Sequence, residues 1–139
     1  MKRIALISVN NFKIPYIIFP IGISYISTYL NEKMPEWQTE VFDFNMGDYE
    51  DLTEFCRNGN FKYIGISVRN IDDTNYYEQI SFMAHYHKIM QIIRENSNAV
   101  VLMGGSGFSI YPGILFRELQ PDWGIHGEGE ENICKLITA

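Results

Sequence analysis

Basic residues are scarce in this chain of 139 residues, where 11 lysines and arginines stand against 17 aspartates and glutamates, giving a formal charge of −6. Nucleic-acid binding depends on clustered lysine and arginine, so this composition argues against nucleic acid as the main partner. Cysteine is also scarce. Cys56 and Cys134 lie far apart, each in a segment that favours helix, which indicates neither a disulfide framework nor a cysteine metal site.

Long apolar runs are absent as well. The most apolar window, residues 14–30, contains Pro15, Pro20 and Gly22 and is shorter than the roughly 20 residues that a membrane span needs. Residues 1–9 combine a basic tip with an apolar run, but no small-residue cleavage site follows. We interpret them as a first strand and expect a cytoplasmic, soluble protein that does not contact a membrane.

Short apolar segments of strand length recur along the chain and are separated by helix-length segments. Most have little polar alternation, which is typical of strands covered on both faces of a parallel sheet. The expected strands are 4–9, 39–44, 63–68, 100–103 and 123–125. The pattern predicts an α/β fold, a Rossmann-like (flavodoxin-like) open parallel sheet of five strands with helices on both faces, in one domain over residues 1–139.

The expected helices are 21–33, 49–57, 73–96, 112–119 and a last one from 130 onward. Asn58 and Gly59 are expected to cap the second helix in a left-handed conformation. The third helix carries two apolar stripes, which predicts that something outside this chain covers Phe82, Tyr86 and Ile89. His87 lies in the other stripe, so we interpret it as a hydrogen-bonded core residue rather than a ligand.

Ligands of open parallel sheets bind at the carboxyl ends of the strands. The five loops there are 10–20, 45–48, 69–73, 104–111 and 127–130, and we expect one large pocket across them. A dinucleotide-binding fingerprint would need glycines after the first strand, where this chain has Asn10 and Asn11. Flavin mononucleotide binding, a phosphorelay receiver site and a Walker loop also lack their marker residues.

Several motifs together resemble a known family. They are Pro-Ile-Gly-Ile (20–23), Val-Phe-Asp-Phe-Asn (41–45), Gly-Ile-Ser-Val-Arg-Asn-Ile-Asp-Asp-Thr-Asn (65–75), Gly-Gly-Ser-Gly-Phe-Ser (104–109) and Gly-Glu-Gly-Glu (127–130). The combination is similar to the N-terminal cobalamin-binding domain of cobalamin-dependent radical S-adenosylmethionine enzymes, in the methyltransferase-like branch. The resemblance covers nearly the whole chain, and its narrowest motif is the segment 65–75.

The resemblance implies that cobalamin lies over the strand ends with its nucleotide tail inside the domain. Glycines after the fourth strand would leave a slot for the tail, serines would hydrogen-bond it, Asp43 and Asn45 would meet the corrin amides, and Glu128 and Glu130 would offer acceptors. The implied cofactor-binding residues are Asn10, Asn11, Asp43, Asn45, Ser67, Arg69, Asn70, Asp72, Asp73, Asn75, Gly104, Gly105, Ser106, Gly107, Phe108, His126, Gly127, Glu128, Gly129 and Glu130. No catalytic residue and no protein metal site are expected.

The first loop lacks the Asp-x-His-x-x-Gly motif whose histidine ligates cobalt in mutase-type cobalamin domains. We therefore expect base-off cobalamin without a histidine ligand, and Arg69 is the leading candidate to face the cobalt. Alternatives remain open for single residues. Arg69 could pair with Asp72 or Asp73, these acids could cap the third helix, and the glycines could serve chain reversal alone.

We expect this chain to be the cofactor module of a longer radical S-adenosylmethionine methyltransferase or related enzyme, and to be inactive by itself. S-adenosylmethionine and an iron-sulfur cluster would bind in a downstream radical S-adenosylmethionine domain, because two distant cysteines cannot supply the cluster's three ligands. The alternatives are a ligand-binding or sensor domain of the same fold without a catalytic role, or an enzyme that binds a small nucleotide.

Overall fold

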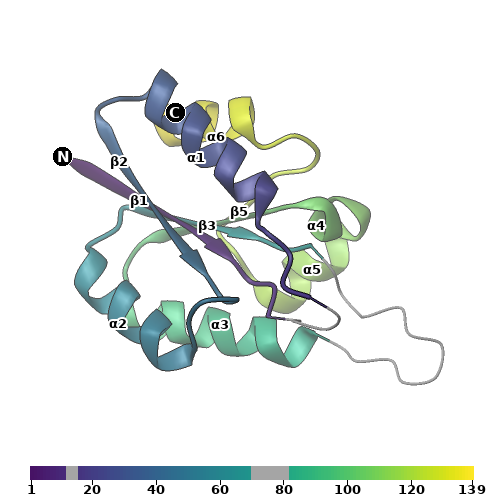
Figure 1. The fold of residues 1–139 in the computed structure, drawn as a ribbon. Helices are drawn as coiled ribbons and strands as arrows, with labels where there is room; N and C mark the ends of the chain where they lie inside the picture. Colours follow the sequence, from purple (N-terminus) through teal and green to yellow (C-terminus); the bar gives the residue numbers. More distant parts are fainter. Residues whose placement is uncertain (12–15, 70–81) are drawn as a thin grey trace.

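A computed structural model describes residues 1–11, 16–69 and 82–139. Five parallel strands form one sheet in the order β2-β1-β3-β4-β5, as Figure 1 shows. The strands are β1 (Lys2–Ser8), β2 (Trp37–Asp43), β3 (Tyr63–Ser67), β4 (Val100–Gly104) and β5 (Trp123–Gly124). This order is that of flavodoxin-like folds, so the predicted fold class is confirmed.

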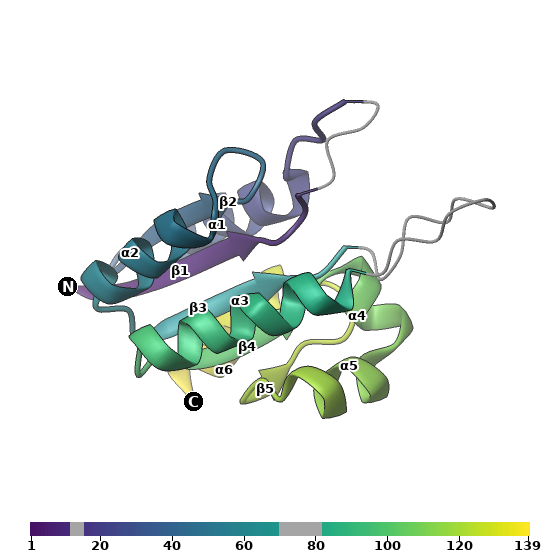
Figure 2. The ribbon, with the colours of Figure 1, turned by 90° about the horizontal axis from the view of Figure 1, so that it is seen from below.

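Helices cover both faces of the sheet. They are α1 (Ile21–Lys33), α2 (Tyr49–Gly59), α3 (Met83–Asn96), α4 (Ser106–Ile110), α5 (Pro112–Leu119) and α6 (Glu130–Thr138). Helices α1 and α6 pack together on one face, while α2, α3 and α5 cover the other, as Figures 1 and 2 show. None of these described helices is long and apolar enough to cross a membrane.

Alternate residues of the strands supply two cores. Ile4, Leu6 and Leu102 face α1 and α6, whereas Ile7 and Ile64 belong to the cluster under α2 and α3. Each of these side chains is at most 2% exposed. Burying one such side chain contributes roughly 1.5–3 kcal/mol, so the two-sided burial explains why these strands are almost uniformly apolar.

The prediction that something outside this chain covers one stripe of the third helix is wrong. Phe82, Tyr86 and Ile89 are 7%, 4% and 1% exposed and pack into the core of this chain itself. The assignment of the core histidine is also wrong, because His87 is exposed and His85 is buried. His85 follows Phe82 by three positions and precedes Ile89 by four, so it shares their face. The expected part of this helix over 73–81 lies outside the described residues.

Two further boundaries differ from the prediction. The left-handed cap of α2 is Asn60, at φ 47°, and not the Asn58-Gly59 pair, because the helix runs through Gly59. Asparagine is one of the few residues that tolerates this conformation. The glycine-rich segment after β4 was expected to be a loop, yet it contains the short helix α4.

Candidate functional site

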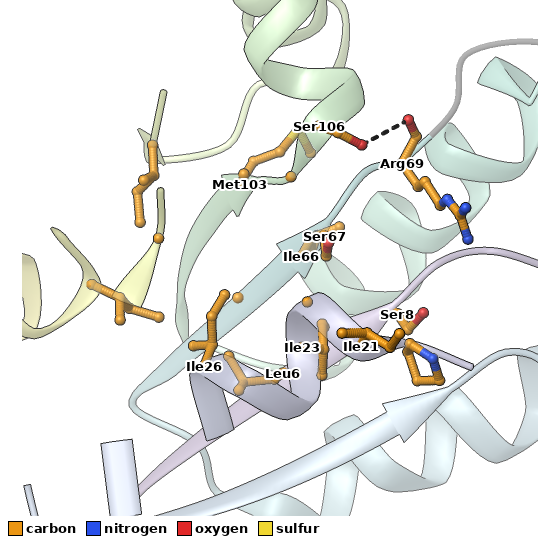
Figure 3. Close-up of a pocket in the computed structure, with 18 of the residues that line it drawn as sticks. Leu6, Ser8, Ile21, Ile23, Ile26, Ile66, Ser67, Arg69, Met103 and Ser106 are labelled. Carbon is orange, nitrogen blue, oxygen red and sulfur yellow. Dashed lines mark hydrogen bonds between the residues drawn. The ribbon is translucent and has the colours of Figure 1, made fainter. Parts of the chain in front are cut away.

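A cavity of about 630 Å³ lies between the sheet and the start of α1, at the carboxyl ends of β1, β3 and β4. The lining residues come from the sheet, from α1, from α4 and from the segment 125–133. Figure 3 shows part of this lining, including Leu6, Ser8 and Ser67 of the sheet and Ile23 and Ile26 of α1. This is where open α/β sheets bind ligands, and the volume is within the range of small-molecule pockets.

The floor of the cavity consists of two rows of residues that are paired across the sheet. The row at the strand ends is Ser8, Ser67 and Gly104, and the row behind it is Leu6, Gly65 and Leu102. Residues two apart in a strand point to the same face, so both rows face the cavity. Since no side chain in the outer row is larger than serine, the sheet leaves space at its edge.

The cavity wall on the α1 side is mostly apolar, and the wall on the α6 side contains both apolar and charged residues. Ile18 to Ile23 and Ile26 form the first wall, and Ile125, Ile133 and the loop 127–130 form the second. The Oγ of Ser109 accepts a hydrogen bond from the amide of Gly127 at 2.9 Å, which holds α4 against this loop. An apolar cavity with a few polar groups at its rim suits a ligand with an apolar, partly polar extension.

Hydrogen bonds to backbone carbonyls of the segment that leaves β3 hold the rim between β3 and β4. The hydroxyl of Ser106 donates to the carbonyl oxygen of Arg69 at 3.3 Å (Figure 3), and the amide of Gly107 donates to the carbonyl of Val68 at 2.9 Å. Gly105 has φ 102°, and a Cβ atom there would lie 2.5 Å from the Val68 oxygen. Only glycine fits this close approach. The Arg69 side chain, next in the chain to Val68, is exposed and lies at the cavity rim.

Residues 7–137 match the family described as the B12 binding domain. This span covers nearly the whole chain. The chain belongs to the B12-binding domain family. This match and the relatives described next confirm the resemblance to the cobalamin-binding domains of cobalamin-dependent radical S-adenosylmethionine enzymes.

Individual relatives agree with this family. The tryptophan 2-C-methyltransferase of Streptomyces laurentii is 29% identical over 98% of this chain and 22% of the enzyme. The radical S-adenosylmethionine methyltransferase TsrM from Kitasatospora setae, solved with tryptophan substrate and a SAM analog bound, is 30% identical, with a TM-score of 0.89 over 100% of this chain and 26% of that one. The chain therefore spans about a quarter of the length of these relatives.

A second solved relative shares the fold. The cobalamin-dependent S-adenosylmethionine radical enzyme OxsB, solved with aqua-cobalamin and S-adenosylmethionine bound, is 20% identical, with a TM-score of 0.72. The match covers 99% of this chain and 18% of OxsB. At this identity the match supports the architecture of a B12-binding domain and no individual residue.

Many of the residues expected at the cofactor site of this B12-binding domain line the cavity. These are Asn10, Ser67, Arg69, Gly104, Gly105, Ser106, Gly127, Glu128, Gly129 and Glu130. They come from the ends of β3 and β4 and from the loops after β1, β3, β4 and β5. The pocket was expected to extend across all five loops, but no residue of the loop 45–48 lines this cavity. The expected residues Asn70, Asp72, Asp73 and Asn75 lie outside the described residues.

Other expected residues lie away from the cavity lining. Phe108 is buried in the core and packs on Gly124, while His126 is exposed beside α5. The carboxylate of Asp43 accepts a hydrogen bond from the amide of Asn45 at 3.0 Å, and the Asn45 side chain donates to the carbonyl of Ile18 at 3.1 Å. Asp43 and Asn45 therefore shape the loop after β2.

Gly107 and Asn11 are also outside the cavity lining. A Cβ atom on Gly107 would lie 2.7 Å from the carbonyl oxygen of Arg69, so this glycine is required by packing within the chain rather than by a ligand slot. Asn11 lies 3.5 Å, side-chain nitrogen to ring nitrogen, from the Nδ1 of His85. It belongs to the polar cluster around that histidine.

Ser67 and Gly104 of the floor were predicted as site residues, whereas the other four floor residues were not. These four, Leu6, Ser8, Gly65 and Leu102, lie within strands. A signal for them exists in the sequence, because Ser8 and Ser67 end their strands and Gly65 lies two positions before Ser67. Small residues at the ends of adjacent strands on one face leave a hollow there.

None of the three histidines lines the cavity. His85 is buried in the cluster under α2 and α3, where its ring packs edge-on against Phe44, and His87 and His126 are exposed. Within residues 1–11, 16–69 and 82–139, no group of three His, Cys, Asp or Glu side chains is placed to hold a metal ion.

Proposed function

We propose that this chain binds base-off cobalamin, with the nucleotide tail in the cavity between the sheet and α1. The observation that carries the proposal is the outer floor row, Ser8, Ser67 and Gly104, which keeps the strand ends open in a domain of the B12-binding family. The apolar wall of α1 would pack on the tail's base, and the serine hydroxyls would bind its polar groups.

Polar groups around the cavity fit the many amides of cobalamin. Glu128 and Glu130 carry carboxylates that accept hydrogen bonds from amides, and both line the cavity.

We further propose that no histidine of this chain ligates the cobalt and that Arg69 faces it instead. The placement of all three histidines away from the cavity supports the first part, and the position of Arg69 on the cavity rim supports the second. A guanidinium has no lone pair to donate to a metal, so it leaves cobalt without a protein ligand on that side. Bound cobalamin supplies a cobalt centre that can carry a methyl group.

The role that fits best is that of the cofactor domain of a cobalamin-dependent radical S-adenosylmethionine methyltransferase. The similar enzymes are about four times as long as this chain, so the iron-sulfur cluster, S-adenosylmethionine and the substrate would bind in the remaining part of such a protein. The isolated chain would then bind the cofactor and catalyse no reaction.

A titration with hydroxocobalamin tests the proposal. We expect the purified chain to retain cobalamin through gel filtration and to shift its visible spectrum to that of a form without the benzimidazole ligand. Apo-protein prepared in parallel and cobalamin passed alone through the column are the controls. Complete loss of the cofactor on the column, together with an unshifted spectrum, contradicts the proposal.

A further inference from the structure

His85 of α3 lies against the segment that follows β1. Its side chain is 9% exposed, and both ring nitrogens have hydrogen-bond partners. Its Nε2 is 2.7 Å from the carbonyl oxygen of Val9, and its Nδ1 is 2.6 Å from the hydroxyl of Tyr49. A carbonyl only accepts, so Nε2 carries the proton and donates to Val9. In the neutral ring Nδ1 then accepts from the Tyr49 hydroxyl, so the neutral form of His85 is the Nε2–H tautomer.

The ring is held from several elements at once. Its centroid is 4.9 Å from that of Phe44, which follows β2, in an edge-to-face arrangement, and 5.5 Å from that of Tyr49 in α2. The side-chain nitrogen of Asn11 lies 3.5 Å from Nδ1. His85 itself belongs to α3, so one side chain connects α3 and α2 to the segments that follow β1 and β2.

The carbonyl that His85 binds lies directly between two cavity residues. Ser8 is part of the cavity floor, Asn10 lines the cavity, and Val9 between them is 1% exposed in the opposite core. Neighbouring residues of an extended chain point to opposite sides, so a shift of Val9 moves Ser8 and Asn10 as well.

We propose that His85 is a positioning residue for the cofactor cavity, which holds Val9 and thereby sets Ser8 and Asn10 at the cobalamin site. The inference rests on the proposed function, since it assigns the cavity to cobalamin, and it adds a residue on the opposite side of the sheet. It also makes cofactor affinity depend on the neutral form of His85, because a proton on Nδ1 reverses the hydrogen bond with Tyr49, whose hydroxyl must turn to accept it, and places a charge among buried side chains.

The surroundings of the ring support this dependence. Burial lowers the pKa of His85 from its usual value, and the hydrogen bond to the Val9 carbonyl opposes that shift in part. The titratable groups that the structure places against the ring are the phenols of Tyr49 from α2 and Tyr86 from α3, and both are uncharged at neutral pH. Acidification therefore adds a charge in a buried, neutral cluster.

Two variants of His85 and a matched control test the inference. His85→Phe keeps a ring of similar size but removes both hydrogen bonds, and His85→Gln keeps one amide donor for Val9. His87→Phe is the control, because His87 lies on the same helix and is exposed. The measurements are the dissociation constant for hydroxocobalamin and, without cofactor, amide hydrogen exchange of residues 8–11, both made well below the unfolding transition.

We expect His85→Phe to weaken hydroxocobalamin binding about tenfold, as an unsatisfied buried carbonyl can, and to speed exchange at residues 8–11. His85→Gln should restore most of the affinity and the slow exchange. The affinity of the unmodified chain should fall from about pH 7 to about pH 5.5. The affinity of His85→Gln should stay nearly constant over this range, after correction for the pH profile of the His87→Phe control.

Unchanged affinity and exchange in His85→Phe, with normal binding by the unmodified chain, overturn the inference. If the phenylalanine variant does not fold, the pH profile of His85→Gln decides, and a profile parallel to that of the unmodified chain overturns the inference. Absence of binding by the unmodified chain refutes the proposed function instead. In that case the exchange at residues 8–11 still determines whether His85 holds the end of β1.

Discussion

Gly107 packs directly on Arg69, since a Cβ atom built on Gly107 would lie 2.7 Å from the Arg69 carbonyl oxygen and 3.1 Å from that of Val68. The first turn of α4 therefore touches the backbone that leaves β3. The position of Arg69 at the cavity rim depends on a residue that does not line the cavity itself.

Gly107→Ala should destabilise the chain by about 1–3 kcal/mol, because the added methyl group meets backbone atoms that cannot rotate away. The free energy of unfolding, measured with urea, tests this. Gly113→Ala is the control, because Gly113 is a helix residue with nothing within 4 Å of its Cβ position. Alanine at 113 should be neutral or slightly stabilising. Equal stability changes in the two variants would contradict the packing argument.

Much of the fold is predictable from the sequence because apolar strands with little alternation carry a strong signal. The segments around Ile4, Ile64 and Val101 are each covered on both faces, as expected. The phase of α3 was harder to predict. Histidine counts as polar in a periodicity argument, so the sequence does not distinguish buried His85, whose hydrogen bonds offset its polarity, from exposed His87.

The sequence predicts which loops form the site, but it predicts less well which residues of those loops face the cavity. Ser67 and Arg69 line the cavity, whereas Val68 between them lies in the opposite core. Whether a residue after a strand faces a ligand depends on backbone turns that the sequence does not specify. Phe108 follows the glycine-rich segment yet points into the core, because α4 starts within that segment.

Filling the cavity floor tests the assignment of the cavity to the cofactor. Ser67→Leu should weaken hydroxocobalamin binding by about tenfold or more, because the larger side chain occupies space between the sheet and α1. Visible titration measures the affinity, and thermal unfolding shows that the chain remains folded. Ser27→Leu is the matched control, because Ser27 is a partly exposed residue of α1 outside the cavity lining. Similar affinities in both variants would place the cofactor elsewhere.

The stability of the chain should fall below pH 6.5 in part because of His85. Burial lowers the folded-state pKa of His85, and the Val9 hydrogen bond only partly opposes this. Above the unfolded-state pKa of about 6.5 both states are neutral and the full stabilisation is present. As the pH falls through that value towards the lower folded-state pKa, the unfolded chain takes up a proton more readily, so the free energy of unfolding decreases.

Urea unfolding at about pH 7 and about pH 5.5 measures this decrease. His85→Gln should show a smaller decrease than the unmodified chain, while His87→Gln, at an exposed position of the same helix, should behave like the unmodified chain. Equal decreases in all three proteins would mean that His85 does not contribute.

Arg69 offers the most direct test of how the cobalt is held. Because Arg69 is exposed on the cavity rim, Arg69→His places an imidazole where the chain has no histidine near the cofactor site. If Arg69 faces the cobalt as proposed, hydroxocobalamin bound to this variant should change to a nitrogen-ligated form with a visible spectral shift. Arg69→Leu should bind with little loss of affinity and keep the base-off spectrum, because most of the binding energy would come from the tail and the corrin amides.

The alternative, in which Arg69 only pairs with a nearby acid, gives a different pattern. Both Arg69 variants would then lose similar, small amounts of stability, and neither would change the spectrum of the bound cofactor, since a surface ion pair typically contributes 0–1 kcal/mol. The pH dependence of the Arg69→His spectrum separates the two cases. A cobalt-bound imidazole must be deprotonated, so the nitrogen-ligated spectrum should disappear as the pH falls and return when it is raised, whereas a spectrum independent of pH excludes ligation by the new histidine.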